Sequence, residues 1–334
     1  PGSAVGGSGR AAGSGEAPRL TLLCRSRAQA DAALELEPGL VYELQLDFLE
    51  AQGLEEAVAA ARAAGQRVAV CLPRVLKPGE DALWRRYRRL QADVLLVRSA
   101  GALHQLLGLG GPAAAGAEEG AVSPALVGDF SLNAANALSA SAFLGLPGLE
   151  RLTPTHDLNV AQVCELARGL GPARAAHLEV VAHQHLPIFH TEHCVFCRFL
   201  TKGNDYTDCG HPCEKGTLHL RDASGRDHRV MADMGCRNTV FNAEAQSAAH
   251  DLGELAAAGV GFLRLELVDE PAEAVRPLVA RYHGALRGHV EPEALWDFVA
   301  ALPDANGRPQ GVSRGSLDDA AWRERAPAQL RPSA

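Results

Sequence analysis

The chain contains 334 residues, 47% of them hydrophobic, and carries a formal net charge of −8. This length suffices for one large domain or two small ones, and no apolar run is long enough to predict a membrane span. The acidic balance excludes a global basic field that recruits nucleic acid, so an RNA partner requires a local basic patch.

The first predicted segment, residues 1–18, is rich in glycine, serine and alanine, which is typical of a flexible linker. It lacks the apolar core of a secretory signal. Five of the eight cysteines cluster, which leaves Cys24, Cys71 and Cys164 as outliers and makes a disulfide framework a poor interpretation. Clustered thiols in a reducing compartment more often bind metal. We therefore expect the cytoplasm or the stroma of an organelle, plastids included, as the location.

Short apolar runs typical of buried strands alternate with alanine-rich segments of helical spacing from Arg19 onward. The eight predicted strands are residues 20–24, 40–46, 67–72, 93–97, 125–129, 149–153, 177–183 and 261–267. Strands that are apolar along their length and separated by helices predict a parallel sheet covered on both faces. Eight such units favour an α/β fold of the (βα)8 TIM-barrel-like kind over residues 19–288, with an open doubly wound sheet as the alternative.

Residues 289–334 follow the predicted barrel. They begin with a predicted helix at 292–303 and continue in polar sequence rich in proline, glycine and arginine, which predicts a disordered tail. The expected organisation is therefore a linker, a barrel domain, and a C-terminal helix with its tail.

Residues 183–242 interrupt the strand–helix alternation after the seventh predicted strand. In a barrel, the loops after the C-terminal ends of the strands carry the functional site, so this Cys-rich insert is where we expect the chemistry. Its cysteines are Cys194, Cys197, Cys209, Cys213 and Cys236.

The spacing of these cysteines, a C-x2-C pair and a C-x3-C pair followed by a fifth, favours a metal centre over buried free thiols. A structural zinc site of the ribbon type uses two C-x2-C pairs and four ligands. An iron–sulfur cluster also takes four cysteines and tolerates irregular spacing. Spacing alone leaves both metals open.

Two carboxylates lie on strands that are otherwise apolar, Glu179 on the seventh and Glu266 on the eighth. A buried carboxylate is costly unless it is paired or faces a site, so each is either catalytic or the partner of an arginine such as Arg264. His185 and His190 belong to a group of four histidines at the start of the insert and are candidate bases near neutral pH. Any single histidine of this group is more often structural than functional.

Candidate substrate-binding residues follow the fifth strand and the last cysteine of the insert. Asp129 and Asn133 lie where barrel strands end, although helix capping explains a polar residue there equally well. Arg237 and Asn238 suit an anionic substrate unless they belong to a solvated loop. Arg264 is a further candidate cation for such a substrate.

Six phrases of the sequence carry a resemblance to a known family. They are GDFSLNAANALSA (128–140), TPTHDLN (153–159), HLEVVAHQHLPIFHTEHCVFC (177–197), DCGHPCE (208–214), ADMGCRNTVFN (232–242) and GVGFLRLEL (259–267). In these phrases the chain resembles peptidase family U32, the collagenase-like proteins. The closest resemblance is to the C-terminal part of the long members, which are related to RNA hydroxylation proteins.

The resemblance implies a barrel-like domain and, from several family members, oxygen-independent hydroxylation. Some of those members act on bases of ribosomal or transfer RNA, and others act in ubiquinone synthesis and hold a 4Fe–4S cluster. Carried over by position, the implied cluster ligands are Cys194, Cys209, Cys213 and Cys236, with Cys197 as the spare. The chain has His-Thr-Glu-His where short members have Ser-Gly-Arg, and Asp-Cys-Gly instead of Arg-Gly-Cys, which leaves the fourth ligand and the substrate open.

We therefore expect an iron–sulfur-dependent hydroxylation enzyme, or a component of one, that acts on RNA bases and has an electron donor as partner. RNA binding would require a cationic patch near Arg198, Arg237 and Arg264, because no cluster of positive charge is evident in the sequence. The sequence has no H-E-x-x-H helix. A U32-type peptidase and a non-catalytic, metal-stabilised binding barrel are the alternatives.

Overall fold

The computed structural model describes residues 17–49, 51–108, 124–304 and 306–320. Most of the predicted linker (1–18) and the end of the predicted tail (321–334) lie outside the described residues. The predicted helix after the barrel is present as α11 (Pro292–Ala301).

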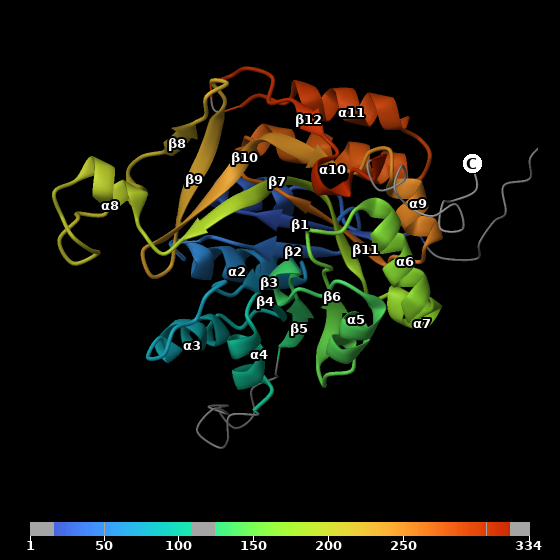
Figure 1. The fold of residues 1–334 in the computed structure, drawn as a ribbon, viewed down its shortest axis with the longest axis horizontal. Helices are drawn as coiled ribbons and strands as arrows, with labels where there is room; N and C mark the ends of the chain where they lie inside the picture. The colour runs from blue at the N-terminus through green and yellow to red at the C-terminus, as the bar shows by residue number, and fades with distance from the viewer. Residues whose placement is uncertain (1–16, 50, 109–123, 305, 321–334) are drawn as a thin grey trace, which may run out of the picture.

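A ring of eight parallel strands forms the centre of the described chain (Figure 1). In order around the ring they are β1 (Arg19–Cys24), β2 (Glu43–Leu46), β3 (Val68–Cys71), β4 (Val94–Val97), β5 (Ala125–Gly128), β6 (Leu149–Leu152), β7 (Glu179–Thr191) and β11 (Phe262–Glu266). The ring closes where the Leu152 amide donates to the His177 carbonyl at 3.0 Å, beside a parallel bridge between Leu152 and Leu178. The predicted TIM-barrel-like fold is therefore confirmed.

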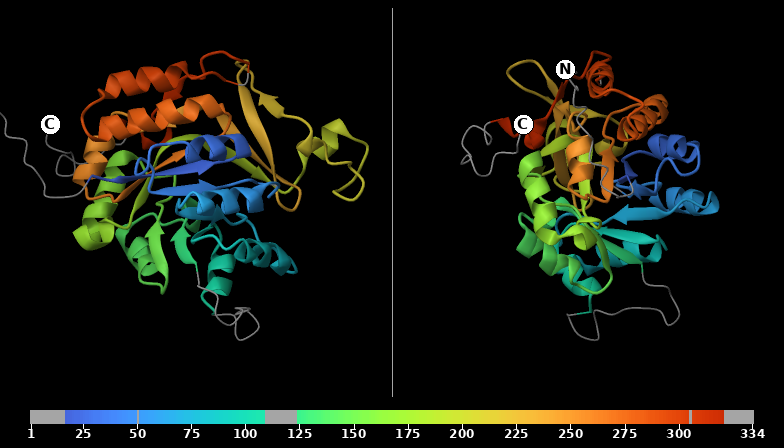
Figure 2. Two further views of the ribbon diagram at one scale, coloured as in Figure 1. Left: turned by 180° about the vertical axis from the view of Figure 1, so that it is seen from behind. Right: turned by 90° about the vertical axis from the view of Figure 1, so that its right-hand side faces the viewer.

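Helices follow the strands and cover the outside of the ring (Figure 2). They are α1 (Arg27–Leu34), α2 (Leu54–Ala63), α3 (Asp81–Arg89), α4 (Ala100–Leu106), α5 (Ala137–Leu144), α6 (Val160–Leu170), α7 (Pro172–Ala175), α9 (Leu252–Ala257) and α10 (Ala272–Leu286). Leu20 and Leu22 pack in the large core between strands and helices, whereas Leu23 belongs to a separate cluster with Ala69 and Val127. This alternation arises because neighbouring side chains of a strand point to opposite faces. No helix of the described chain is both long and apolar enough to span a membrane.

The Cys-rich insert contains a second sheet that the sequence does not predict. β7 is 13 residues long and pairs antiparallel with β10 (Arg237–Ser247). The sheet continues through β9 (Asp227–Asp233) to β8 (Leu218–Arg221). A short helix, α8 (Val195–Leu200), and a 3-10 turn, η2 (Pro212–Glu214), lie at its far end, where Figure 1 shows them projecting from the barrel. As predicted, the insert follows the C-terminal end of the seventh barrel strand.

A buried polar group joins β7 to the segment that precedes α10. One carboxylate oxygen of Glu270 lies 3.0 Å from His183 Nε2 and 3.3 Å from His185 Nε2. Burial raises the pKa of Glu270, but His185 and His183 lower it more, so the pKa lies well below its ordinary value. Burial lowers the pKa of His185, but Glu270 raises it more. These opposite shifts show that the fold favours the charged forms of the two groups.

The close approach of β11 to the end of α7 leaves no room for a side chain at Gly261. A Cβ at this position would lie 1.9 Å from the carbonyl oxygen of Ala176. We expect Gly261→Ala to lower the free energy of unfolding by about 2 kcal/mol, because the backbone must shift to relieve the overlap. The matched control is Gly253→Ala in α9, where a Cβ has open space, and it should raise stability by up to about 1 kcal/mol. Equal urea midpoints for the two variants would contradict the close contact between Gly261 and the carbonyl of Ala176.

Replacing Glu270 with glutamine should reveal the charged pair through the pH dependence of stability. The raised pKa of His185 stabilises the fold below about pH 6.5 and is lost as pH rises through the folded-state pKa. The lowered pKa of Glu270 stabilises the fold above about pH 4.3 and is lost as pH falls. Glu270→Gln should therefore lower the free energy of unfolding most between these two pH values, by about 3 kcal/mol, because it leaves His185 buried without its anion.

The measurement is urea unfolding of wild type and Glu270→Gln at about pH 5.5 and about pH 8.5, the two sides of the ordinary histidine pKa. Exposed Glu273→Gln in α10 is the control and should stay within about 0.5 kcal/mol of wild type. A Glu270→Gln deficit of the same size at both pH values would show that the pair contributes no charge interaction.

Candidate metal centre and barrel mouth

Six charged side chains form a closed ring of alternating sign at the C-terminal ends of the barrel strands, which we call the mouth ring. Its members in order are Arg25, Asp47, Arg98, Asp129, Arg264 and Glu266. All six side chains are at most 8% exposed. Charges buried to this degree are tolerated only when they are paired, and this ring pairs each member with two others.

Arg98 makes the most extensive contacts within the mouth ring. Its two terminal nitrogens donate to the two oxygens of Asp47 at 2.8 and 2.9 Å, and its Nε donates to Asp129 at 2.8 Å. Arg264 donates to the other oxygen of Asp129 at 2.6 Å. Burial raises the pKa of Asp129, but Arg264 and Arg98 lower it more, so the pKa lies below its ordinary value. Asp129 is thus held as a carboxylate, and its Oδ1 also accepts from the Phe130 amide as a helix cap.

Glu266 completes the mouth ring between two arginines. Its oxygens lie 2.8 Å from Arg25 Nη2 and 2.9 Å from Arg264 Nε. Burial raises its pKa, but Arg264 and Arg25 lower it more. A carboxylate held in this way is a weak base, so the predicted alternative of an arginine partner describes Glu266 better than a catalytic base does.

Glu179 lies deeper, inside the barrel and fully buried. It accepts hydrogen bonds from Thr21 and Gln45, and Arg151 Nε lies 3.5 Å from its second oxygen. Arg264 is 3.9 Å from the same oxygen. These contacts fill the barrel interior, and they place Glu179 among structural partners instead of at the mouth.

Arg25, Asp47 and Arg98 are not candidates in the sequence analysis, although a signal for them exists. Each is the first residue after a predicted strand, and Asp129 is the last residue of one. In a barrel that position faces the C-terminal mouth, so a charged residue there indicates a mouth contact. Asn133, in contrast, is exposed and takes a left-handed backbone conformation (φ 59°) at the end of a 3-10 turn, a role that asparagine tolerates well.

A small pocket of about 30 Å³ opens beside the mouth ring and is lined by His190, Arg74 and Asp233, among others. His190 Nδ1 lies 3.0 Å from the Thr239 hydroxyl, and its Nε2 is buried without a hydrogen-bond partner. Burial and the nearby Arg74 lower the pKa of His190. A neutral imidazole with its proton on Nδ1 presents Nε2 as a hydrogen-bond acceptor in this pocket, whereas His185 is engaged by Glu270 and the Asn242 carbonyl.

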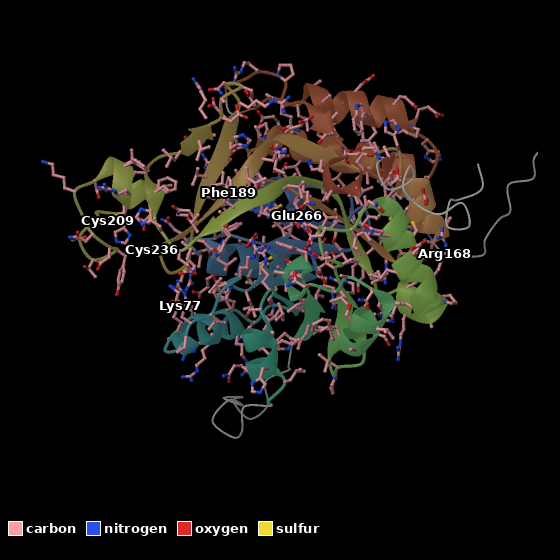
Figure 3. The ribbon with its side chains drawn as sticks, viewed as in Figure 1. Lys77, Arg168, Phe189, Cys209, Cys236 and Glu266 are labelled. Carbon is pink, nitrogen blue, oxygen red and sulfur yellow. The ribbon has the colours of Figure 1, made fainter. Side chains whose placement is uncertain are left out.

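All five cysteines of the insert line one cavity of about 1030 Å³. Cys194 caps the N-terminus of α8, and Cys197 lies within that helix. Cys213 lies in η2, and Cys236 lies in the turn between β9 and β10 with φ 61°. A left-handed conformation is unusual for a residue with a side chain and is retained where the surroundings require it. Cys209 lines the cavity from the loop before η2 (Figure 3).

Arg237 and Asn238 follow Cys236 and contact segments that line this cavity. Arg237 is 1% exposed, and it pairs with Glu80 at 2.8 Å and with Glu192 at 2.9 Å. The Asn238 side chain accepts from the Val195 amide at 2.6 Å and so fixes the first turn of α8. These two residues fasten the cysteine loops to α3 and β7, and the charge of Arg237 is already neutralised in the described structure.

The described cysteines are close enough to influence one another but are not arranged around a single ion. Burial and the neighbouring Cys194, Cys209 and Cys197 raise the pKa of Cys236. Among the described residues, no three His, Cys, Asp or Glu side chains converge closely enough to hold one metal ion. Five soft thiol donors around a roomy cavity suit a polynuclear iron–sulfur cluster better than a mononuclear zinc.

A basic helix borders the same cavity. α3 carries Arg85, Arg86, Arg88 and Arg89, of which Arg86 lines the cavity and Arg86 and Arg89 are exposed. This is the local cluster of positive charge that the sequence analysis overlooks. Two of the arginines named for the predicted patch do not contribute to it, because Arg237 and Arg264 are buried and paired.

No curated protein sequence matches the chain. Among solved structures, the U32 peptidase Mk0906 is similar with 13% identity, 79% of this chain and 98% of that chain covered, and a TM-score of 0.41. A putative fructose-1,6-bisphosphate aldolase from Coccidioides immitis is similar with 11% identity, coverage of 85% and 88%, and a TM-score of 0.42. Similarities of this size carry no functional conclusion.

The sequence profile of the family described as peptidase family U32 matches residues 112–311, which is more than half of the chain. The match includes the fifth to eighth barrel strands and the whole Cys-rich insert. The chain therefore belongs to peptidase family U32.

Proposed function

We propose that this protein is an iron–sulfur-dependent enzyme that hydroxylates RNA bases, or the catalytic component of such an enzyme. The observation that carries the proposal is the gathering of five cysteines around one cavity next to the barrel mouth. The cysteines come from three separate parts of the insert, so their meeting is a product of the fold.

The residues that would hold a 4Fe–4S cluster are Cys194, Cys209, Cys213 and Cys236, with Cys197 beside them. Such a cluster supplies one-electron chemistry at a potential set by its surroundings. The two residues that follow Cys236 support this assignment, because Asn238 and Arg237 fix the cysteine loops to the barrel through buried contacts. Zinc is the alternative metal and would require the thiols to move closer together.

The barrel mouth would bind the substrate and transfer protons to and from it. The mouth ring has no net charge and provides a rigid floor, since each of its carboxylates is held by arginine. Of the four acid–base candidates from the sequence, His190 is the best placed, because its Nε2 is unpartnered and lines the mouth pocket. Glu179, Glu266 and His185 would instead hold the surrounding structure in place.

RNA is the preferred substrate because a basic helix and an exposed aromatic border the cysteine cavity. Arg86 and Arg89 of α3 are exposed and could contact phosphates. Tyr206 is 64% exposed and lines the cavity, and an exposed aromatic ring is suited to stack an unpaired base. An electron donor would be a second partner, as the redox chemistry of the cluster requires one.

The family description gives the competing function, a peptidase. The hydrogen bonds of two insert cysteines do not favour a thiol nucleophile. The Cys194 sulfur accepts from the Cys197 amide, and the Cys197 thiol donates to the Gly203 carbonyl, so both contacts are to the backbone. A cysteine nucleophile is normally paired with a general base such as histidine.

The paired variant Cys209→Ala/Cys213→Ala tests the metal and the activity together. We expect it to lose bound iron and, with it, RNA-base hydroxylation, because two of the proposed ligands are removed. The control is Cys164→Ala on α6, a buried cysteine that does not line the cavity, and it should keep both. Iron by elemental analysis, base hydroxylation by mass spectrometry of RNA, and peptide cleavage are measured on each protein. Peptide cleavage that persists in the iron-free variant would favour the peptidase.

Removing two exposed arginines of α3 tests the RNA surface. For Arg86→Ala/Arg89→Ala we expect weaker binding of a single-stranded RNA, and a plot of log affinity against log salt that is shallower by about two units. The control is Arg168→Ala/Arg276→Ala, exposed arginines on α6 and α10, of which Arg168 lies across the molecule from Cys209 in Figure 3. Fluorescence anisotropy at several salt concentrations measures both. An equal loss in the control would indicate that α3 is not the RNA surface.

A further inference from the structure

Asp233 occupies the boundary between the two cavities of the site. It is the last residue of β9 and lines both the mouth pocket and the cysteine cavity. It is 8% exposed, and one of its oxygens accepts from the Met234 amide at 2.7 Å. No other carboxylate among the described residues lines both cavities.

Asp233 also differs from the carboxylates of the mouth ring in its partners. Asp47, Asp129 and Glu266 are each paired with arginine, whereas no Lys, Arg or His of the described chain lies within ion-pair distance of Asp233. A carboxylate buried without a cation is costly, and the usual response of such a group is to keep its proton. The charges of the mouth ring therefore neutralise one another, and Asp233 is not one of the paired groups.

The charges around Asp233 agree with this picture. Burial and the negative charge of Asp47 raise the pKa of Asp233 to about 7, although Arg98 and Arg237 act in the opposite direction. Other titratable and charged groups face Asp233 from the surrounding elements or line the cavities near the mouth. They are Arg25, Asp47, Arg74, Tyr87, Arg98, His190, Arg237 and Glu266. An acid with a pKa close to neutral is suited to proton transfer.

We propose that Asp233 is the acid of this site, holding a proton between the two cavities and donating it to a ligand bound in the mouth pocket. The inference rests on the proposed function, because it takes the two cavities to be one active site. In the transfer, the carboxyl O–H bond breaks and the bond from that proton to a basic atom of the ligand forms. The negative charge left on Asp233 faces Arg98 and Arg237, and a proton from water in the cysteine cavity restores the acid.

His190 complements Asp233 in the same pocket. The unpartnered Nε2 of His190 is an acceptor, while the protonated carboxyl group of Asp233 is a donor. The pocket, at about 30 Å³, has room for one polar group, so a donor and an acceptor there suit a ligand that inserts only an edge carrying both, such as the amide-like edge of a nucleobase.

Asp233→Asn tests the inference in the full chain, because asparagine keeps the shape but cannot release a proton. Infrared spectroscopy of wild type should show a protonated carboxyl that titrates near pH 7, and this band should be absent from Asp233→Asn. The exposed Asp297→Asn on α11 is the control and should retain the band. A wild type without a carboxyl that titrates above about pH 5, the upper range of ordinary carboxyl groups, would overturn the inference.

Stability and activity give two further readouts of Asp233→Asn. The raised pKa of Asp233 contributes stability that is complete below the ordinary aspartate pKa of about 3.9 and is lost as pH rises to about 7, so the urea midpoint of wild type should fall relative to Asp233→Asn between about pH 4 and pH 7. An ion-paired aspartate with a lowered pKa would show no such fall over this range. Hydroxylation by wild type should decline above about pH 7, whereas Asp233→Asn should lose activity about 100-fold and show no such decline.

These experiments distinguish a failure of the proton-transfer inference from a failure of the proposed function. Full activity in Asp233→Asn would overturn the proton transfer while leaving the hydroxylase in place. An iron-loaded wild type without hydroxylation would overturn the proposed function, and the infrared titration would still decide whether Asp233 holds a proton.

Discussion

Three arginines and three carboxylates alternate around the mouth of the barrel, and no member of this mouth ring could remain buried without its neighbours. The contacts between them range from 2.6 to 3.2 Å. Removing one partner would leave an uncompensated buried charge, which costs several kcal/mol. The mouth ring therefore fixes the ends of β1, β2, β4, β5 and β11 relative to one another. It also determines which groups are left for chemistry, because its own charges cancel.

The position of the insert relative to this fixed mouth is set by one long strand. β7 begins as a barrel strand and ends as a strand of the insert sheet, so the orientation of the cysteine cavity follows from the barrel. Arg237 adds a second attachment, since it bonds to Glu80 at the start of α3 and to Glu192 after β7. The cavity, the basic helix and the mouth pocket consequently lie together, with Asp233 bordering both cavities.

The barrel could be predicted because its strands are short apolar runs separated by helices, and all eight exist, although the seventh continues to Thr191, well beyond its predicted end at residue 183. The insert sheet could not, since β8, β9 and β10 mix polar and apolar residues and their pairing depends on contacts with β7. Cysteine spacing predicted that the five insert cysteines, Cys197 included, lie near one another, but not how they are arranged around the cavity. Arg25, Asp47 and Arg98 were missed because no motif surrounds them, although their place directly after strands was a usable signal. Arg264 was named as a possible partner of Glu266, but Arg25 and the partners of Glu179 are distant in sequence, so burial alone could not separate structure from catalysis.

The central claim is that the insert cysteines hold an iron–sulfur cluster beside the barrel mouth. The most direct measurement is the visible absorption of protein purified without oxygen, together with its iron and acid-labile sulfide content. We expect broad visible absorption, and iron and sulfide in equal amounts of about four per chain, as in a 4Fe–4S cluster. Protein that contains zinc without sulfide, or that stays colourless after reconstitution with iron and sulfide, would contradict the claim.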